Sequence, residues 1–323
     1  MNPLDFIGKK INHFLYRWNY TRAPKLNHKK PIDVSLELSS ICNLRCPYCY
    51  NAEPQNVPFK KGMMELKTAQ LIIAQAADLS VPALKFNWKG EATLNPHFPA
   101  ITKFAKEHAS GYTFQDRLLN SNFKFPWNKD EIFEGLCNQT KVKVSFDSFI
   151  PEIFARQRKG ANYDEVLFNI TRFYNWKGRT TELVIQSVRT KLNKDEDIEG
   201  EVKRRWPSAG ISIRDMVLGR IESQAVKDLE HRERDFSERQ SCIQAHSRLV
   251  FNWDGIAFPC CVDIAESMPL GDIKATDLHE IFRSHRANEL RKSLLNKSAF
   301  KCGPCDKCPS FETFKGYKPP WNS

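Results

Sequence analysis

Hydrophobic and polar positions alternate between strand-like and helix-like patterns from residue 31 onward. Short apolar runs predict strands at 33–39, 83–88, 113–119, 141–146, 182–188 and 211–217. Between them, apolar residues recur at helical spacing near 64–79, 98–109, 129–137, 163–176 and 195–205. Alternating strands and helices predict an α/β fold with a parallel sheet, and six units are too few to close an eight-stranded barrel. We therefore expect a partial (β/α)6 TIM-like barrel over residues 31–221.

The remaining chain divides by pattern into three further segments. In residues 1–30, helical spacing predicts an amphipathic helix whose apolar stripe packs on the main body, a membrane-surface helix being the alternative; the stripe comprises Leu4, Ile7, Ile11, Phe14, Leu15 and Trp18. Residues 222–241 are dense in charge and predict a polar linker. Residues 242–323 are rich in cysteine and poor in periodicity, which predicts a small domain where metal replaces part of a core.

Composition makes the cysteines informative. The chain has no apolar run of about 18 residues and no signal-peptide pattern, so we expect a cytoplasmic protein without a membrane span. Stable disulfides are rare in that compartment, so clustered cysteines indicate metal binding or catalysis. The net charge of +11 lies in short dispersed pairs, which favours a solvated surface over a nucleic-acid-binding patch.

Three cysteines follow the first predicted strand at the spacing C-x3-C-x2-C: Cys42, Cys46 and Cys49. Thiolates are soft ligands that suit iron–sulfur clusters or zinc. A structural zinc site has four protein ligands, whereas three thiolates on a four-iron cluster leave one iron open. The spacing therefore predicts a reactive cluster.

With Tyr48 directly before the third cysteine, this segment resembles the cluster motif of radical S-adenosylmethionine (SAM) enzymes. The resemblance implies a [4Fe–4S] cluster whose open iron binds SAM. It also implies reductive cleavage of SAM to a 5′-deoxyadenosyl radical that abstracts a substrate hydrogen. By the same resemblance, Tyr48 lies near the adenine of the cofactor.

Motifs after the second and third predicted strands extend the resemblance. Gly90 and Glu91 stand where the family has Gly-Gly-Glu touching the amino group of SAM, and Lys89 replaces the first glycine. Asn122 stands in the family's Thr-Asn-Gly, in which Phe123 replaces the glycine.

The fourth and fifth strands end in further polar residues. Ser145 begins a segment similar to the family's Ser-x-Asp-Gly, with Ser148 in place of the glycine, and Arg158 follows downstream. The resemblance implies that Ser145 binds the ribose and Arg158 the carboxylate, while Gln186 faces the same mouth. The three replacements, Lys89, Phe123 and Ser148, indicate a divergent branch.

The C-terminal cysteines predict a second soft-metal site, either iron–sulfur or zinc. Trp253, Asp254 and Gly255 predict a hairpin turn before Cys260 and Cys261. Beside the first motif, the section resembles the SPASM or twitch extension, which implies one auxiliary [4Fe–4S] cluster. The expected ligands are Cys242, Cys260, Cys302 and either Cys305 or Cys308.

Two residues of this section are candidates for chemistry. Asp263 is a candidate general base, with capping of a turn as its structural alternative. Cys261 is a candidate hydrogen-atom donor, and packing is its structural alternative.

Together these features predict a radical SAM oxidoreductase or maturase with one auxiliary cluster. Its substrate is a carbohydrate- or nucleotide-like metabolite or a ribosomal peptide, and residues 1–30 are too short for a peptide-binding winged helix. The expected electron donor is a flavodoxin or ferredoxin. The alternative is a non-catalytic, zinc-containing nucleic-acid-binding protein, which explains the positive charge but not the strand-end residues.

Overall fold

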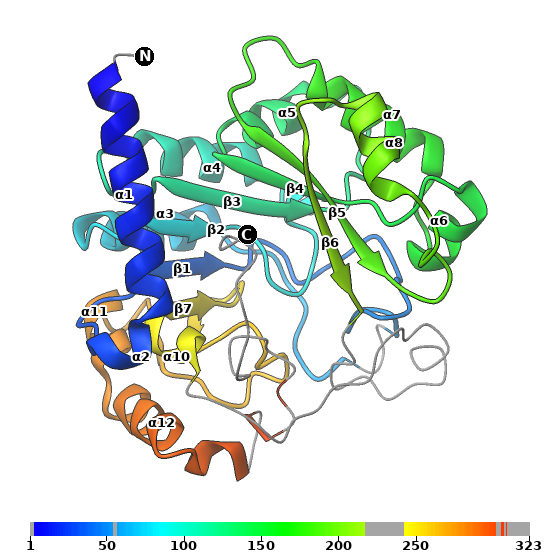
Figure 1. The fold of residues 1–323 in the computed structure, drawn as a ribbon. Coiled ribbons are helices and arrows are strands. Elements are labelled where there is room, and N and C mark those ends of the chain that lie inside the picture. The colour runs from blue at the N-terminus through cyan, green and yellow to red at the C-terminus, as the bar shows by residue number, and fades with distance from the viewer. Residues whose placement is uncertain (1–2, 54–56, 217–241, 302–304, 307, 309–323) are drawn as a thin grey trace.

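The computed structural model describes residues 3–53, 57–216, 242–301, 305–306 and 308. Its centre is a curved sheet (Figure 1) of six parallel strands: β1 Asp33–Leu36, β2 Ala83–Lys85, β3 Asp116–Ser121, β4 Lys141–Ser145, β5 Glu182–Arg189 and β6 Gly210–Asp215. These strands pair in sequence order, each parallel to the next. The predicted partial (β/α)6 barrel is therefore confirmed.

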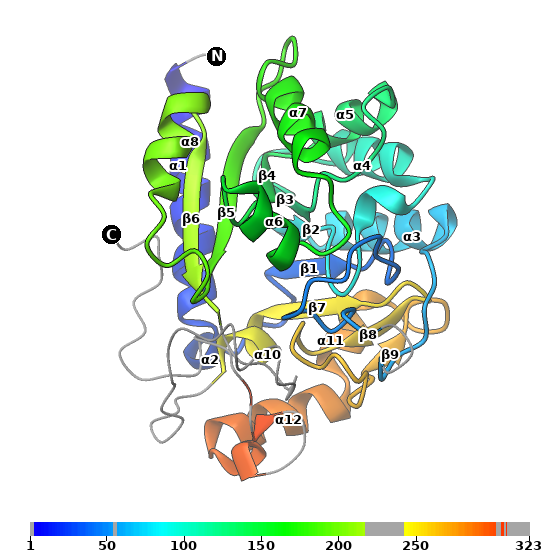
Figure 2. The same ribbon diagram turned by 90° about the vertical axis from the view of Figure 1, so that its right-hand side faces the viewer.

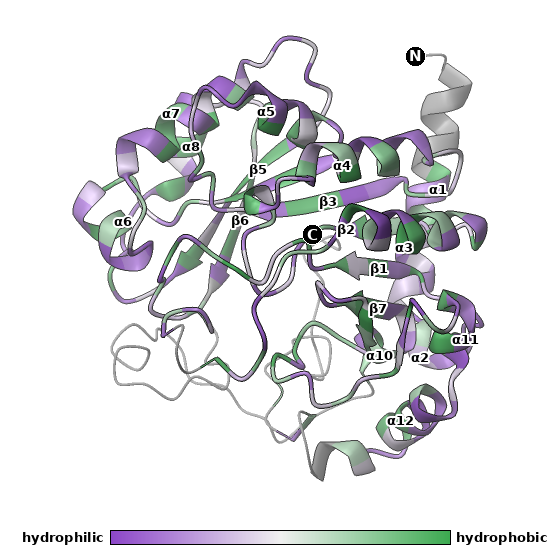
Figure 3. Cartoon of the chain, turned by 180° about the vertical axis from the view of Figure 1, so that it is seen from behind, coloured by the Kyte–Doolittle hydropathy of each residue, from purple (hydrophilic) through white to green (hydrophobic). Residues whose placement is uncertain are grey.

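Helices cover the convex face of the sheet: α3 Leu66–Asp78, α4 Phe98–Glu107, α5 Asp130–Cys137, α6 Pro151–Gln157, α7 Tyr163–Tyr174 and α8 Ile198–Arg205. Alternate strand residues such as Val142 and Val144 are fully buried with Phe133 and Leu136 in the main hydrophobic core. Figure 3 shows hydrophobic and hydrophilic residues alternating along α3 and α4, the pattern of helices with one buried side. The intervening strand residues, including Lys143, therefore lie on the opposite, concave face.

The N-terminal helix α1 (Pro3–Thr21) lies across the concave face, on the side of the sheet opposite α3, α4, α5 and α7 (Figure 2), and is followed by α2 (Ala23–Leu26). It packs through Tyr16 and Tyr20, which are 1% and 3% exposed. The predicted packing stripe was wrong, since the four members whose side chains are described are exposed: Ile11 53%, Phe14 62%, Leu15 44% and Trp18 42%.

The chemistry of the concave face explains this choice of helix surface. The face beneath α1 includes the buried ion pair of Asp33 with Arg248 (3.1 Å), and Arg248 also lies 3.4 Å from the hydroxyl of Tyr20. A tyrosine combines an apolar ring with a hydroxyl group that can form hydrogen bonds, so it can pack on this polar surface. Aliphatic side chains have no such group.

The C-terminal section extends the same sheet. It contains α10 (Ile243–Ser247), β7 (Arg248–Phe251), β8 (Ile256–Phe258), β9 (Gly271–Asp272), α11 (Leu278–Arg283) and α12 (His285–Leu295). Strand β7 pairs in parallel with β1, and β8 and β9 follow antiparallel. The predicted hairpin turn is confirmed between β7 and β8, where Gly255 adopts a φ of 91°.

Among the described residues, two short 3-10 helices add to these elements, Ala92–Leu94 and Ser298–Lys301. The charged linker predicted for 222–241 lies outside the described residues. Within the part of the chain that is described, no helix has the length and apolar character needed to cross a membrane.

Candidate functional site

The loop after β1 carries the first three cysteines at the carboxyl edge of the sheet. Its turns are closed by backbone hydrogen bonds from Cys49 to Cys46 (3.0 Å) and from Ala52 to Cys49 (2.9 Å). A third bond, from the backbone N–H of Arg45 to the carbonyl of Lys159 (2.8 Å), ties the loop to the segment after α6. These hydrogen bonds fix the position of the loop relative to the barrel.

Burial makes these thiols weak acids in the metal-free protein. It raises the pKa of Cys42 to about 12, with a contribution from the nearby carboxylate of Glu91. Burial also raises the pKa of Cys46 to about 11, against the opposing effect of Arg158. A bound metal cluster reverses this preference, because metal ions stabilise thiolates and release their protons.

Side-chain donors from two other elements lie beside the sulfurs. The Asn122 amide, after β3, is 3.8 Å from the sulfur of Cys42, and a guanidinium nitrogen of Arg158, after α6, is 3.9 Å from that of Cys46. Donors near cluster sulfurs tune the cluster's electronic properties.

Asp147, to which the sequence assigned no role, organises this region. Its fully buried carboxylate lies 2.6 Å from Nε of Arg158 and accepts a hydrogen bond from Nη2 at 2.9 Å. It also accepts a hydrogen bond from the hydroxyl of Tyr48. This ion pair holds the pKa of Arg158 well above its ordinary value, although burial opposes it.

Gly90 is required by a close approach of two backbone segments. A Cβ at this position would lie 2.4 Å from the carbonyl oxygen of Ser39 and 2.6 Å from that of Ile41. The next residue, Glu91, donates its backbone N–H to the Ile41 carbonyl at 2.9 Å. This close approach of the two backbone segments leaves no room for a side chain at Gly90.

The carboxylate of Glu91 joins the ends of β2 and β3. Oε1 accepts hydrogen bonds from the hydroxyls of Thr93 (2.8 Å) and Ser121 (2.9 Å), and Oε2 accepts one from the backbone of Asn122 (2.8 Å). Burial raises the pKa of Glu91, while these donors lower it. Oε2 retains acceptor capacity for a further donor.

Ser145 and Gln186 complete the edge from the next two strands. They are register partners, Ser145 as the last residue of β4 and Gln186 in the second half of β5, so their side chains share the concave face. We call Glu91, Asn122, Ser145 and Gln186 the strand-end residues. Of the predicted cofactor-binding residues, Glu91, Asn122 and Arg158 lie beside the cysteines, and Ser145 and Gln186 lie on neighbouring strands.

Lys89 shows why lysine is tolerated in place of the family's glycine. Its buried ammonium pairs with Glu37 at 3.4 Å and with Glu266, and lies 3.8 Å from the ring centroid of Trp88. Because Glu266 belongs to the loop before β9, these ion pairs connect the end of β2 to the C-terminal section.

The other two replacements also have local explanations. Phe123 adopts a left-handed φ of 57°, which favours glycine, but its ring is fully buried against Phe125 and Phe173. Ser148 donates to Glu196 (2.7 Å) and accepts from the backbone of Ile150 (3.0 Å), so its hydroxyl closes a turn.

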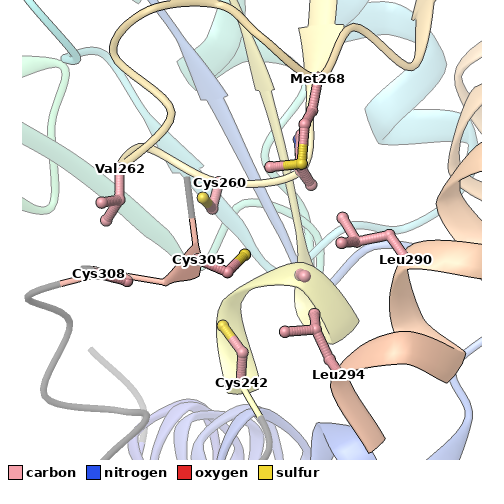
Figure 4. Close-up of a pocket in the computed structure, with 10 residues that line it drawn as sticks. Cys242, Cys260, Val262, Met268, Leu290, Leu294, Cys305 and Cys308 are labelled. Carbon is pink, nitrogen blue, oxygen red and sulfur yellow. The ribbon is translucent and has the colours of Figure 1, made fainter. Parts of the chain in front are cut away.

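A second group of thiols lines a small apolar cavity in the C-terminal section (Figure 4). Its cysteines come from the start of α10, the end of β8 and the C-terminal segment: Cys242, Cys260, Cys305 and Cys308. Val262, Met268, Leu290 and Leu294 supply apolar walls. Burial and the neighbouring thiols raise the pKa of Cys260 well above its ordinary value.

The donor set of this cavity fits a soft metal centre. Among the described residues, no three His, Cys, Asp or Glu side chains converge closely enough to hold a single metal ion. Cys302, one of the expected ligands, lies outside the described residues.

Cys261 and Asp263 occupy structural positions. The sulfur of Cys261 lies 3.4 Å from both Gln244 Oε1 and Arg248 Nη1, and the residue is not part of the cavity lining. Asp263 is fully buried and accepts three hydrogen bonds within its own loop, two from Ser267 and one from Met268. These contacts support packing for Cys261 and turn capping for Asp263, the alternatives given above.

One family model matches the C-terminal section. Residues 242–309 match the SPASM family model, described as an iron-sulfur cluster-binding domain. No curated protein matches the chain.

Three solved structures share the fold. BtrN in complex with AdoMet and 2-DOIA is 16% identical, with a TM-score of 0.56 over 86% of this chain and 92% of that one. SuiB of Streptococcus suis bound to S-adenosylmethionine is 13% identical, with a TM-score of 0.58 over 87% and 72%. The protein anSMEcpe with bound AdoMet is 16% identical, with a TM-score of 0.62 over 86% and 88%. Further structures hold SuiB with the precursor peptide SuiA and anSMEcpe with the Cp18Cys peptide.

Proposed function

We propose that this chain, whose fold is that of radical SAM enzymes and whose residues 242–309 belong to the SPASM family of iron–sulfur cluster-binding domains, is itself a radical SAM enzyme. The observation that carries the proposal is the convergence of the three cysteines of the loop after β1 with Glu91, Asn122 and Arg158. Three thiolates would hold a [4Fe–4S] cluster and leave one iron without a protein ligand. When bound, the cluster supplies the electron that converts SAM to a 5′-deoxyadenosyl radical, which removes a hydrogen atom from the substrate.

The protein's own residues position the cofactor. Gly90 lets the loop and the end of β2 approach closely, which brings the spare acceptor capacity of Glu91 to the SAM ammonium group. Ser145 and Gln186 offer polar groups to the ribose from adjacent strands. Arg158 keeps its charge because Asp147 is its counterion, and it stabilises negative charge beside Cys46.

We further assign the auxiliary cluster to Cys242, Cys260, Cys305 and Cys308. All four line one cavity, and four thiolates complete the ligand set of a [4Fe–4S] cluster, so Cys305 and Cys308 are assigned together. The apolar walls keep water from the sulfurs, which raises the cost of uncompensated charge and favours thiolates bound to metal.

The proposed reaction is hydrogen abstraction followed by oxidation or another modification. The auxiliary cluster would anchor the substrate or accept the second electron, and a flavodoxin or ferredoxin would deliver the first. The substrate is a small metabolite or a peptide, since proteins of this fold have been solved with 2-DOIA and with peptides.

Anaerobic purification tests the proposal. We expect about eight iron and eight sulfide ions per chain, as two four-iron clusters require, and 5′-deoxyadenosine on reduction in the presence of SAM. Cys42→Ala should abolish deoxyadenosine formation and remove about half of the iron. Cys137→Ala is the matched control, because Cys137 is a partly buried cysteine packed against the main core. Zinc as the dominant metal, or deoxyadenosine release by Cys42→Ala, would contradict the proposal.

A further inference from the structure

Below the strand-end residues, the concave face carries a second row of polar side chains. Asn120 on β3 and Lys143 on β4 are register partners, two residues before Asn122 and Ser145. Asn87 extends this row beyond β2, because the register of Lys85 with Leu118 continues through a hydrogen bond from Phe86 to Leu118 (3.0 Å). Two residues along a strand correspond to about 7 Å, so the row lies one side-chain layer beneath the cofactor site.

Helix α1 closes the face on the other side of this row. Its residue His13 experiences the charges of Asp116, Lys141 and Glu182, which belong to the lower ends of β3, β4 and β5. Lys143 is one layer higher than Lys141. The row of Asn87, Asn120 and Lys143, hereafter the polar row, therefore lies between α1 and the cofactor-binding edge.

Lys143 differs from the other lysines of the concave face because it has no counterion among the described residues. Lys85 is ion-paired with Asp33, and Lys141 lies 2.9 Å from a carboxylate oxygen of Glu182. Among the described residues, no carboxylate lies within ion-pair distance of Lys143. Burial, followed by the charges of Arg214, Lys141 and Lys85, lowers the pKa of Lys143 to about 8, against the opposing charge of Asp116.

Burying the charged ammonium group of such a lysine costs free energy unless a nearby group compensates the charge. A partly buried cation among other cations is stabilised when an anion binds beside it. The strands offer no such anion at this level, because the neighbour of Lys143 on β5 is Val184. A bound anion beside Lys143 would supply this compensation.

The two asparagines also have unused hydrogen-bonding capacity. The side-chain oxygens of Asn87 and Asn120 are buried and have no hydrogen-bond partner in the described part of the protein. Buried amide groups without partners are rare in native proteins. An amide supplies both donors and an acceptor, so this pair can bind hydroxyl or amino groups next to an anion.

We propose that the polar row recognises the substrate, and that the substrate carries a carboxylate or phosphate held by Lys143, with adjoining hydroxyl or amino groups held by Asn87 and Asn120. The inference rests on the proposed function, because it places the substrate directly beneath SAM. It narrows the substrate class from any metabolite or peptide to a compact polar anion.

Calorimetric titration of the anaerobic holoenzyme with SAM bound tests this assignment, with inorganic phosphate and succinate as probes. We expect one site per chain for at least one probe, and the probe that binds more tightly identifies the anionic group. Lys143→Met should weaken binding about tenfold or more, the effect of losing a charge-assisted hydrogen bond, whereas Lys143→Arg should retain most of the affinity. Asn120→Leu, of similar size, should weaken binding with the charge intact.

Lys141→Met is the matched control, because it lies on the same strand and face but is already paired with Glu182. It should bind the probe as the wild type does. Absence of binding to the wild type, or equal affinity in a folded Lys143→Met variant, would overturn the inference. Deoxyadenosine formation by the same wild-type preparation separates the two proposals: release without anion binding refutes only this inference, and anion binding without release refutes the proposed function.

Discussion

At the scale of single residues, Asp147 controls the region around the cysteine loop. It is the counterion of Arg158, it accepts the hydroxyl of Tyr48, and it accepts the backbone N–H of Val188 at 2.8 Å. A single buried carboxylate thus sets the position of a cation beside Cys46 and of the aromatic ring next to Cys49. Loss of this carboxylate should lower the free energy of unfolding and weaken cluster binding.

Asp147→Asn should lower the free energy of unfolding by about 3 kcal/mol, because it leaves the Arg158 charge buried without a partner. Chemical denaturation of the apo protein measures this effect. The control is Asp130→Asn, whose partner is Arg172 and whose side chain is 62% exposed, and for which a loss below about 1 kcal/mol is expected. Equal losses in the two variants would show that the buried pair is not important for stability.

Single substitutions of the last three cysteines separate the possible auxiliary ligand sets. Cys305→Ala and Cys308→Ala should each remove about four iron ions per chain, because both thiols line the cavity. Cys302→Ala should retain the full iron content. Iron and sulfide analysis with electron paramagnetic resonance measures the outcome, and iron loss in Cys302→Ala with retention in Cys308→Ala would reverse the assignment.

The affinity of the polar row for an anion should depend on pH. Lys143, with its pKa lowered to about 8 by burial and by Arg214, Lys141 and Lys85 against the opposing charge of Asp116, is a cation below that pH. Binding should therefore be strongest below pH 8 and fall as the pH rises through it. Titrations from pH 7 to 9 should show this loss in the wild type and not in Lys143→Arg, since arginine stays charged. A flat wild-type profile would argue against Lys143 as the binding cation.

At the scale of secondary-structure elements, α1 illustrates how the surface of a sheet selects the side of a helix that packs on it. The helix contributes Tyr16 and Tyr20 to a small core that also includes Ala23 of α2 and Ala83 of β2. Its aliphatic side faces outward. Periodicity located the helix, but the polar concave face decided its orientation.

Two substitutions in α1 test this orientation directly. Tyr16→Ala should lower the free energy of unfolding by about 3 kcal/mol, as expected for loss of a buried aromatic ring. Phe14→Ala, two residues away and 62% exposed in the wild type, should change it by less than about 0.5 kcal/mol. Thermal or chemical denaturation measures both variants. A larger loss of unfolding free energy in Phe14→Ala than in Tyr16→Ala would show that the aliphatic stripe is the side that packs on the sheet.

At the scale of the whole molecule, the barrel and the C-terminal section form one structure. They share a sheet through β1 and β7, and they share the buried ion pairs of Lys89 with Glu37 and Glu266. The indole N–H of Trp88 adds a hydrogen bond to the backbone of Cys261 at 2.8 Å. The relative positions of the two thiol groups are therefore fixed by contacts around the end of β2.

Lys89→Gly would restore the family's glycine but remove these ion pairs. Glu37, whose pKa burial already raises to about 7, would lose the cation that stabilises its charge. We expect a loss of about 3 kcal/mol in unfolding free energy and faster hydrogen exchange in the segment 262–273. Lys274→Gly, at an exposed lysine paired with Asp254, is the control, and unchanged exchange in Lys89→Gly would show that the ion pairs do not join the two sections.

The sequence by itself determined the strands, the partial barrel and the two groups of cysteines. Strand positions depend on local periodicity, so β1 to β6 could be read to within a few residues. The cysteine spacings and the polar residues after each strand indicated the site, because parallel strands bring their carboxyl ends to a common edge.

Only the tertiary structure decided which side chains face one another. The pairing of Asp147 with Arg158, the Lys89 ion pairs and the isolation of Lys143 among cations depend on strand register and on contacts between distant segments. The same holds for the tyrosine side of α1 and the shared cavity of Cys305 and Cys308. The free energy of burying a charged or polar group depends on which groups surround it in space. The periodicity of a single segment does not contain that information.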